Sequence, residues 1–333
     1  MFLNSTKLVL FGMLLLMMLT MGLLSTASAD FECGGEAELV QEAIDTVFAV
    51  ALYACTDTSI VQTLPTWYAD VWDSTRNLSV PRYYAENSNY KHVVFADPFG
   101  RTDDSCFLGP AQYTPNPPWG NANFNLAIVS AADELIDFGN YDEDGDNYVD
   151  YIFMMYVNFG VSGGYNGFPL PGIYYTNDTS EDGDTIKITS SGCTVYANRE
   201  VAGVFVTAHE YGHDLGFSDI YSYNHMGYGG VGGFSIMARG VLEVNGVEIP
   251  VPIDPFHKAQ IGWVSPIVVV SPLFQEEVDF FNYSDDTYRI ERNSNESFYT
   301  SNHRTGESAP YWEQNYPNYG LLIWHIDKNR LNG

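Results

Sequence analysis

The run His209-Glu210-Tyr211-Gly212-His213 constrains this chain more than any other part of its sequence. Residues four apart lie on one face of a helix, so His209 and His213 point the same way and can hold one metal ion between them. Glu210 is offset around the helix and can reach a water on that metal. This spacing is typical of zinc hydrolases, in which two histidines bind zinc and the glutamate is the general base. We therefore expect a metal-bearing helix over 200–215 whose apolar side packs on a sheet.

The residues after the second histidine supply a third ligand. Gly216 can take a left-handed backbone and end the helix, and Asp219 then arrives six residues after His213. Asp is a hard oxygen donor that zinc accepts, and two His plus one Asp leave a coordination position open for water. Asp219 as a simple cap of the next turn is the alternative, since Asp is common in turns. Glu243 is then the reserve third ligand.

The first 29 residues have the form of a signal peptide. Lys7 supplies a positive start, residues 8–24 form an apolar run, and Ala27-Ser28-Ala29 is a small-residue cleavage site. The run is long enough to be read as an anchor instead, but the cleavage site favours removal. We expect a secreted protein with no stable membrane insertion after cleavage.

The charge balance is strongly acidic, with 14 Lys and Arg against 42 Asp and Glu and a net charge of −28. Nucleic acid and anionic membrane surfaces are excluded as expected partners, because both are themselves negative. Four cysteines fall in the exported part, and an even count outside the cytosol predicts two disulfides. Of the three possible pairings we favour Cys33–Cys55 with Cys106–Cys193.

A second group of metal-binding side chains lies in YDEDGDNYVDYIF. Carboxylates at alternate positions converge when a loop coils around a cation, and a backbone carbonyl follows at position 7. The predicted ligands of this calcium site are Asp142, Asp144, Asp146, Tyr148 and Asp150. The loop departs from an EF-hand, because Asn147 takes the usual glycine position, no bidentate acid stands at position 12, and a strand follows. A solvated acidic turn is the alternative.

The hydrophobic pattern predicts an α+β protein with a mixed sheet. Two further amphipathic helices are expected over 36–53 and 125–138, and strands over 92–96 and 151–157. Residues 99–124 are rich in Gly, Pro and Asn and read as a long surface loop, and residues 160–192 as loop and edge hairpin. After residue 265 the pattern is strand-like. The chain ends soon after an apolar strand, so we expect the sequence to be part of a longer protein.

Several segments together resemble the M6 family of secreted metallopeptidases, the immune inhibitor A type, within the metzincin-like zincins. The resemblance covers roughly residues 78–327, and its most specific part is AHEYGHDLGFSDIY. The other matching segments are SVPRYYAENSNYK, DEDGDNYVDYIFMMY, GGFSIMARG and GLLIWHID. It implies a zincin catalytic domain with a mixed β-sheet, with His209, His213 and Asp219 on zinc and Glu210 as catalytic base. Ser222 stands where the family often has a second acid.

The resemblance also suggests a methionine turn and a domain division. Met237 sits where such proteins have a methionine beneath the metal, an ordinary core Met being the alternative. We expect a signal peptide over 1–29 and a segment over 30–77 that is either a short propeptide or the start of the catalytic domain. The catalytic domain then covers 78–265, and a β-rich part covers 266–333.

The sequence as a whole predicts a secreted zinc endopeptidase that acts on protein or peptide substrates. Tyr221, Tyr223 and Tyr228 are candidates to stabilise the oxyanion, and His225, His257, His303 and His325 lack ligand spacing. Two alternatives stay open. One is a secreted calcium-dependent binding or adhesion module with an inactive zincin core, and the other is a zinc hydrolase acting on something other than peptides.

Overall fold

The computed structural model describes residues 44–55, 63–101, 103–109, 120–157, 162–221, 230–244, 246–273, 277–280, 286–316 and 318–330. The chain divides into two units, Met1–Glu42 and Ala43–Gly333, and all described residues belong to the second. The predicted signal peptide therefore lies outside the described residues, as do Cys33, Tyr223, Tyr228 and His225. Within the described ranges, no helix combines the length and apolar character needed to cross a membrane.

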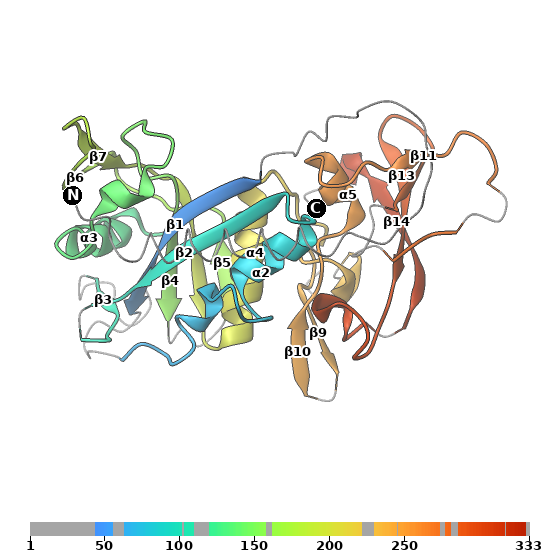
Figure 1. The fold of residues 1–333 in the computed structure, drawn as a ribbon, viewed down its shortest axis with the longest axis horizontal. Helices are drawn as coiled ribbons and strands as arrows, with labels where there is room; N and C mark the ends of the chain where they lie inside the picture. The colour runs from blue at the N-terminus through green and yellow to red at the C-terminus, as the bar shows by residue number, and fades with distance from the viewer. Residues whose placement is uncertain are drawn as a thin grey trace, which may run out of the picture. The chain divides into compact units, whose positions relative to one another are not determined.

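A mixed sheet, as predicted, forms the centre of the described unit (Figure 1), which is a mixed α/β structure. Its strand order is β2-β1-β4-β8-β5, and β3 pairs with the end of β1. All pairings are parallel except that of β5, which runs antiparallel to β8 at one edge. The strands are β1 Asp45–Cys55, β2 His92–Phe99, β3 Phe107–Leu108, β4 Ile152–Val157, β5 Gly163–Tyr165 and β8 Gly192–Ala197.

Strand β1 corrects the helix predicted over 36–53. Residues 45–55 are a strand whose last seven positions are buried, paired with β2 on one side and β4 on the other. A strand covered on both faces is apolar at nearly every position, so its sequence lacks the alternation that separates strand from helix. Tertiary burial therefore decided the structure of this segment. It also places part of the predicted 30–77 segment inside the main sheet.

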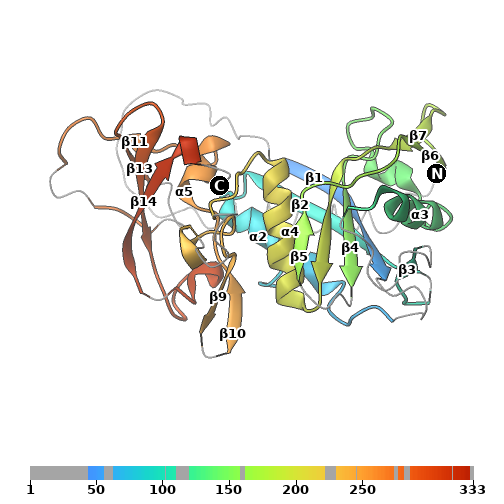
Figure 2. The same cartoon turned by 180° about the vertical axis from the view of Figure 1, so that it is seen from behind.

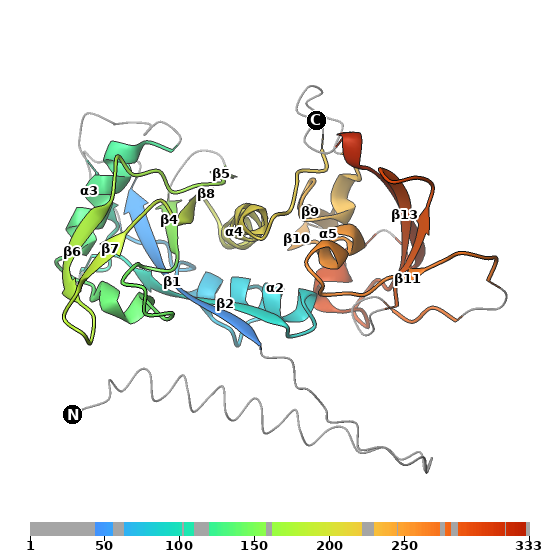
Figure 3. The ribbon, with the colours of Figure 1, turned by 90° about the horizontal axis from the view of Figure 1, so that it is seen from above.

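The two faces of the sheet are covered by different elements (Figure 3). One face packs on α2 (Val80–Asn87) and α4 (Glu200–Asp214), and alternate residues of β1, β4 and β8 point into that core. The opposite face packs on α3 (Ala122–Ala132) and on the hairpin of β6 (Tyr174–Thr179) and β7 (Thr185–Ile188). The alternation follows from the two-residue period of a strand.

Other predicted elements are confirmed with changes. The strands over 92–96 and 151–157 correspond to β2 and β4. The hairpin within 160–192 is β6–β7, but it forms a separate two-stranded sheet on one face of the main sheet, and the edge strand in this range is β5. The helix predicted over 125–138 is found at Ala122–Ala132. It begins earlier because Asn121 accepts N–H groups of the first turn. The expected long loop contains β3 and the start of α3.

The C-terminal half adds a second, four-stranded sheet in the described residues, with order β11-β12-β13-β14. Helix α5 contacts β13, and β10 contacts α4, and both elements lie between the two sheets (Figure 1). The strand-like pattern after residue 265 is thereby confirmed. The elements are β9 Val241–Val244, β10 Val247–Pro250, α5 Pro255–Gln260, β11 Ile267–Val268, β12 Tyr288–Glu291, β13 Glu296–His303 and β14 Gly320–Asp327.

The predicted disulfide pairing is wrong. Cys55 pairs with Cys106 across a sequence separation of 51 residues, and Cys193 is a buried free thiol in β8. The register explains the bond, because β3 lies parallel to the last residues of β1, where Ala54 faces Phe107. Cys55 and Cys106 therefore come to 5.4 Å between Cα atoms, within the range for a disulfide. The spacing of the cysteines along the sequence does not indicate that pairing.

Candidate metal centre

The predicted site residues lie on α4 and on the turn that follows it (Figure 2). Gly216 has φ of 89°, and the last turn closes through Phe217 N–H to Gly212 O and Gly216 N–H to His213 O, both 2.9 Å. These two bonds form a Schellman motif, which stops the helix and reverses the chain. The predicted helix end at Gly216 is confirmed. The reversal carries Asp219 back toward the helix.

The three predicted zinc ligands converge. Their nitrogen and carboxylate atoms all lie within 4.8 Å of one another. The Oδ1 atom of Asp219 is 3.1 Å from Nε2 of His209 and 3.5 Å from Nε2 of His213. The three side chains are 12%, 15% and 6% exposed for His209, His213 and Asp219, so they form a partly enclosed cluster. A turn-capping role alone does not require this convergence.

Both histidines present the correct nitrogen to the cluster. The Nδ1 atom of His209 lies 2.8 Å from the carbonyl oxygen of Ile236, and that of His213 lies 2.8 Å from the carbonyl oxygen of Phe217. A carbonyl oxygen only accepts, so each Nδ1 carries a hydrogen, and in the neutral ring this leaves the lone pair of Nε2 available to a metal. Metal-binding histidines are oriented by bonds of this kind. The donor set of two imidazoles and one carboxylate therefore fits a divalent metal such as zinc.

Met237 lies directly beneath the helix segment between the two histidines. It is fully buried, and its sulfur would be 2.9 Å from a β-carbon at Gly212, so only glycine allows this approach. The turn is tied to its neighbours, because Ile236 O accepts the His209 ring and Met237 O accepts Ile220 N–H at 3.0 Å. Its placement matches the methionine turn that the resemblance implies.

Glu210 lies beside the ligand cluster and against the edge strand β5. Its side chain is buried, and its Cγ would be 2.2 Å from a β-carbon at Gly164. Burial raises the pKa of Glu210 to about 7, the charge of His209 opposes this, and those of Asp219 and Asp214 add to it. A carboxylate with such a pKa can both take up and release a proton near neutrality.

The remaining candidate residues are not part of this cluster. Glu243 is exposed on β9, where it faces Glu248 across the hairpin. His257 is buried against Asp254, His303 against Glu313, and His325 pairs with Glu296. Of the predicted oxyanion tyrosines, only Tyr221 is described, with its ring centroid 6.2 Å from that of His209.

The predicted calcium loop brings three acids together. Carboxylate oxygens of Asp142, Asp144 and Asp146 lie within 4.8 Å of one another. Asn147 has φ of 68°, the left-handed backbone expected of it. Asp146 accepts the Tyr148 N–H at 2.8 Å, and Asp150 accepts the Glu143 N–H at 3.0 Å. Burial raises the pKa of Asp150, and the neighbouring carboxylates add to the rise.

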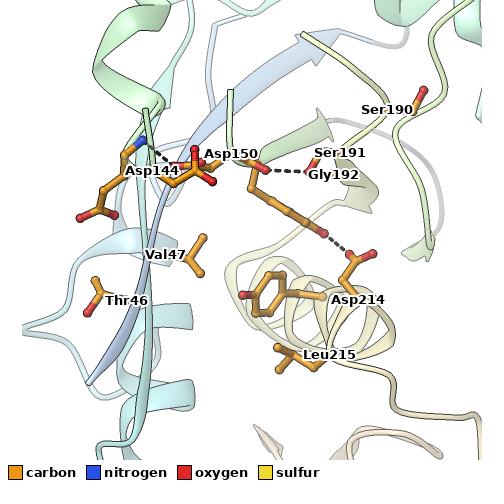
Figure 4. A pocket seen from close by; sticks show the side chains of 12 residues that line it. Thr46, Val47, Asp144, Asp150, Ser190, Ser191, Gly192, Asp214 and Leu215 are labelled. Atoms are coloured by element: carbon orange, nitrogen blue, oxygen red, sulfur yellow. Dashed lines mark hydrogen bonds between the residues drawn. The ribbon is translucent and has the colours of Figure 1, made fainter. Parts of the chain in front are cut away.

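A cavity of about 590 Å³ opens on a different face of α4 (Figure 4). Tyr211, Asp214 and Leu215 line it from the helix, together with residues that precede or begin β1, β4 and β8. The Tyr151 hydroxyl donates a hydrogen bond to the carboxylate of Asp214. None of the three converging ligands lies in its wall, and neither does Glu210, so this cavity is separate from the candidate metal centre.

Sequence reasoning missed three residues that shape the site. Gly164 makes room for Glu210, and the buried pair of Asp254 and His257 is bonded to the two turns that flank the ligands. The Gly163-Gly164 pair was a visible signal, since glycine in a strand often marks a close approach. The histidine carried no such signal, because Ser218, which links it to the site, is 39 residues away in sequence.

The fold and the site together define a mixed α/β protein with a helix-borne cluster of potential metal ligands. Residues 173–263 match the immune inhibitor A peptidase M6 catalytic domain. The matched range runs from β6 to the end of α5 and contains all three converging ligands, Glu210 and Met237. Among curated proteins, none matches the sequence. The match over residues 173–263 supports an M6 family metallopeptidase, and a peptidase implies protein or peptide substrates.

Proposed function

We propose that this chain is a secreted zinc-dependent endopeptidase. The observation that carries the proposal is the convergence of His209, His213 and Asp219, with Glu210 beside them on the same helix. Two imidazole nitrogens and one carboxylate are a typical donor set for catalytic zinc, which keeps a further position for water. When bound there, zinc supplies Lewis acidity for the scissile carbonyl and lowers the pKa of a water ligand.

Glu210 is the general base in this proposal. It takes a proton from the attacking water and passes it to the nitrogen of the leaving amine. Its burial and raised pKa support both steps, because a carboxylate with pKa near 7 is a stronger base than an exposed one and a competent acid afterwards. The walls of the site come from α4 and β5, so the glutamate cannot swing freely.

Strand β5 offers a place for an extended substrate. It is the last strand of the main sheet and contacts α4 beside Glu210. An extended peptide can add to an exposed sheet edge through main-chain hydrogen bonds, with side-chain pockets giving selectivity. We infer that the substrate backbone lies along Gly163–Tyr165, which brings its scissile bond toward the cluster.

Secretion and a structural calcium ion complete the proposal. The Cys55–Cys106 disulfide supports an oxidising compartment, where such bonds persist. The converging carboxylates of Asp142, Asp144 and Asp146 support a bound cation, since acids this close repel one another without one. The loop leads directly into β4, so a calcium ion there would order the start of a central strand.

Two substitutions test the catalytic assignment. Glu210→Gln preserves shape and leaves the three ligands in place, so it should retain zinc but lose at least about 10²-fold in peptide hydrolysis. Asp219→Ala removes a ligand, so it should lose zinc as well as activity. Elemental analysis and cleavage of a peptide library, with and without a chelator, give the two readouts. Retained hydrolysis by pure Glu210→Gln protein contradicts the base assignment. Absence of any chelator-sensitive cleavage in the wild type favours the binding module.

A further inference from the structure

A buried acid–histidine pair lies at the start of α5, outside the helix that bears the metal motif. Asp254 and His257 are 1% and 0% exposed, and His257 Nδ1 is 2.7 Å from Asp254 Oδ2. Asp254 also caps the helix, because its Oδ1 accepts the His257 backbone N–H at 3.1 Å. A cap alone needs no histidine, and exposed helix starts usually use Asp or Ser without a ring partner. Capping of α5 therefore does not explain why Asp254 is paired with His257.

The other side of the His257 ring holds the turn that carries Asp219. The backbone N–H of Ser218 donates to His257 Nε2 at 3.2 Å. A backbone N–H only donates, so Nε2 carries a lone pair, and the ring hydrogen is on Nδ1, facing Asp254. The geometry thus fixes one neutral tautomer of His257. His257 therefore accepts a bond from Ser218, the residue immediately before Asp219.

The carboxylate of Asp254 reaches the second turn of the site. Ser235 donates its hydroxyl to Asp254 Oδ2 at 2.7 Å, and the Met237 N–H donates to that hydroxyl at 3.1 Å. The same turn accepts the His209 ring through Ile236 O and the Ile220 N–H through Met237 O.

Asp219 is therefore held from both neighbours along the chain. Ser218 is bonded to His257, and Ile220 is bonded to the Met237 turn, which Asp254 fixes. We propose that Asp254 and His257 are positioning residues that hold the Ser218–Ile220 turn so that Asp219 reaches the metal together with His209 and His213. This inference rests on the proposed metal site. It assigns to the pair a function in metal affinity beyond capping α5.

The isosteric change Asp254→Asn tests the proposal. An Asn side chain oriented to cap the helix turns its NH₂ toward His257 Nδ1, which favours the other tautomer and places a hydrogen on Nε2 opposite the Ser218 N–H. A wrong tautomer enforced by an Asp-to-Asn change is known to disable a histidine whose position is intact. Loss of outer partners of this kind weakens metal binding about 10- to 100-fold. We therefore expect the zinc Kd of Asp254→Asn to rise by about 10- to 100-fold, as measured by competition with a chelating dye.

Two variants at position 257 distinguish the loss of the hydrogen-bond acceptor from the loss of side-chain packing. His257→Phe fills the space without an acceptor and should show the same loss of zinc affinity. His257→Gln places an amide oxygen near the position of Nε2 and should restore most of the affinity. The matched control is His303→Phe, because His303 is almost as buried as His257 and is also paired with an acid, but its bonds go to Glu313 and Ser301 rather than to the Asp219 turn. It should lower Tm and leave the zinc Kd unchanged.

The outcomes distinguish this inference from the proposed function. Zinc affinity of Asp254→Asn and His257→Phe equal to that of the wild type overturns the positioning role alone. An equal loss in His303→Phe also overturns it, because the effect is then one of general stability. If His257→Phe does not fold, Asp254→Asn and His257→Gln still decide the matter. If the wild-type protein binds no zinc, or if its zinc binding does not depend on Asp219, the proposed metal site is wrong. The positioning role is then overturned with it.

Discussion

Replacing Gly164 with alanine is expected to disable the site without touching a ligand. A β-carbon at Gly164 would lie 2.2 Å from Cγ, 2.3 Å from Oε1 and 2.5 Å from Cδ of Glu210. Favourable contacts between carbon atoms require about 3.5–4.0 Å. Gly164 does not have a left-handed backbone, so the conflict is purely steric. Glu210 or the strand must therefore move by more than about 1 Å to restore ordinary contact.

The magnitude follows from that displacement. A misplacement of about 1 Å in a catalytic group costs about 10²-fold in rate, which corresponds to about 2.7 kcal/mol of transition-state free energy. We expect kcat/KM of Gly164→Ala to fall by at least this factor in a fluorogenic peptide assay. Zinc content should be unchanged, because the three converging ligands are not in contact with the new methyl group.

The matched control is Gly172→Ala. A β-carbon there meets nothing within 4 Å, and its backbone is also outside the left-handed region. It should behave as the wild type in activity and Tm. Wild-type kcat/KM in Gly164→Ala, with zinc bound, would refute the placement of Glu210 against β5. A loss of zinc along with activity would instead show that the strand, rather than the glutamate, had moved.

Replacing both Cys55 and Cys106 with alanine should lower the free energy of unfolding by about 4 kcal/mol in urea, as expected for a loop of this length, and a change under 1 kcal/mol would contradict the bond. Burial raises the pKa of the Cys193 thiol, so iodoacetamide should label it only after denaturation; mass spectrometry of the native protein checks this. The folded-state pKa of Asp254 is lowered, so the stabilisation from its ionised carboxylate is present above the unfolded pKa of about 4 and is lost as pH falls. The difference in Tm between the wild type and Asp254→Asn should therefore shrink below that pH. A constant difference would contradict the lowered pKa. Calcium should raise Tm of the wild type but not of the double variant Asp142→Ala, Asp144→Ala, and an equal rise in both would rule out this loop.

The candidate site was largely predictable because its determinants are local. Helical spacing places His209, Glu210 and His213, and a glycine stop places Asp219 after a reversal, so a short stretch of sequence contains the cluster. The elements supporting it are not local. The bond of His257 to Ser218 and the approach of Gly164 to Glu210 join residues that only the tertiary fold brings together.

The fold was predicted less evenly, for a related reason. Strands such as β4 and the hairpin β6–β7 carry clear apolar or turn signals, whereas β1 reads as a helix because burial on both faces removes its alternation. The disulfide depended on the same strand. Because β1 pairs with β3, Cys55 and Cys106 are neighbours. A helix over 36–53, as predicted from the sequence, does not bring these two cysteines together.

The position of β1 has a consequence for how the chain reaches its native state. The strand is synthesised early, yet its partner β4 begins about a hundred residues later. At about 5–20 residues per second, one of its edges waits several seconds on the ribosome for a partner. An apolar strand with an open edge is prone to pair with other molecules. Versions of this protein that begin at residue 78 would lack the strand altogether and should collect in the insoluble fraction.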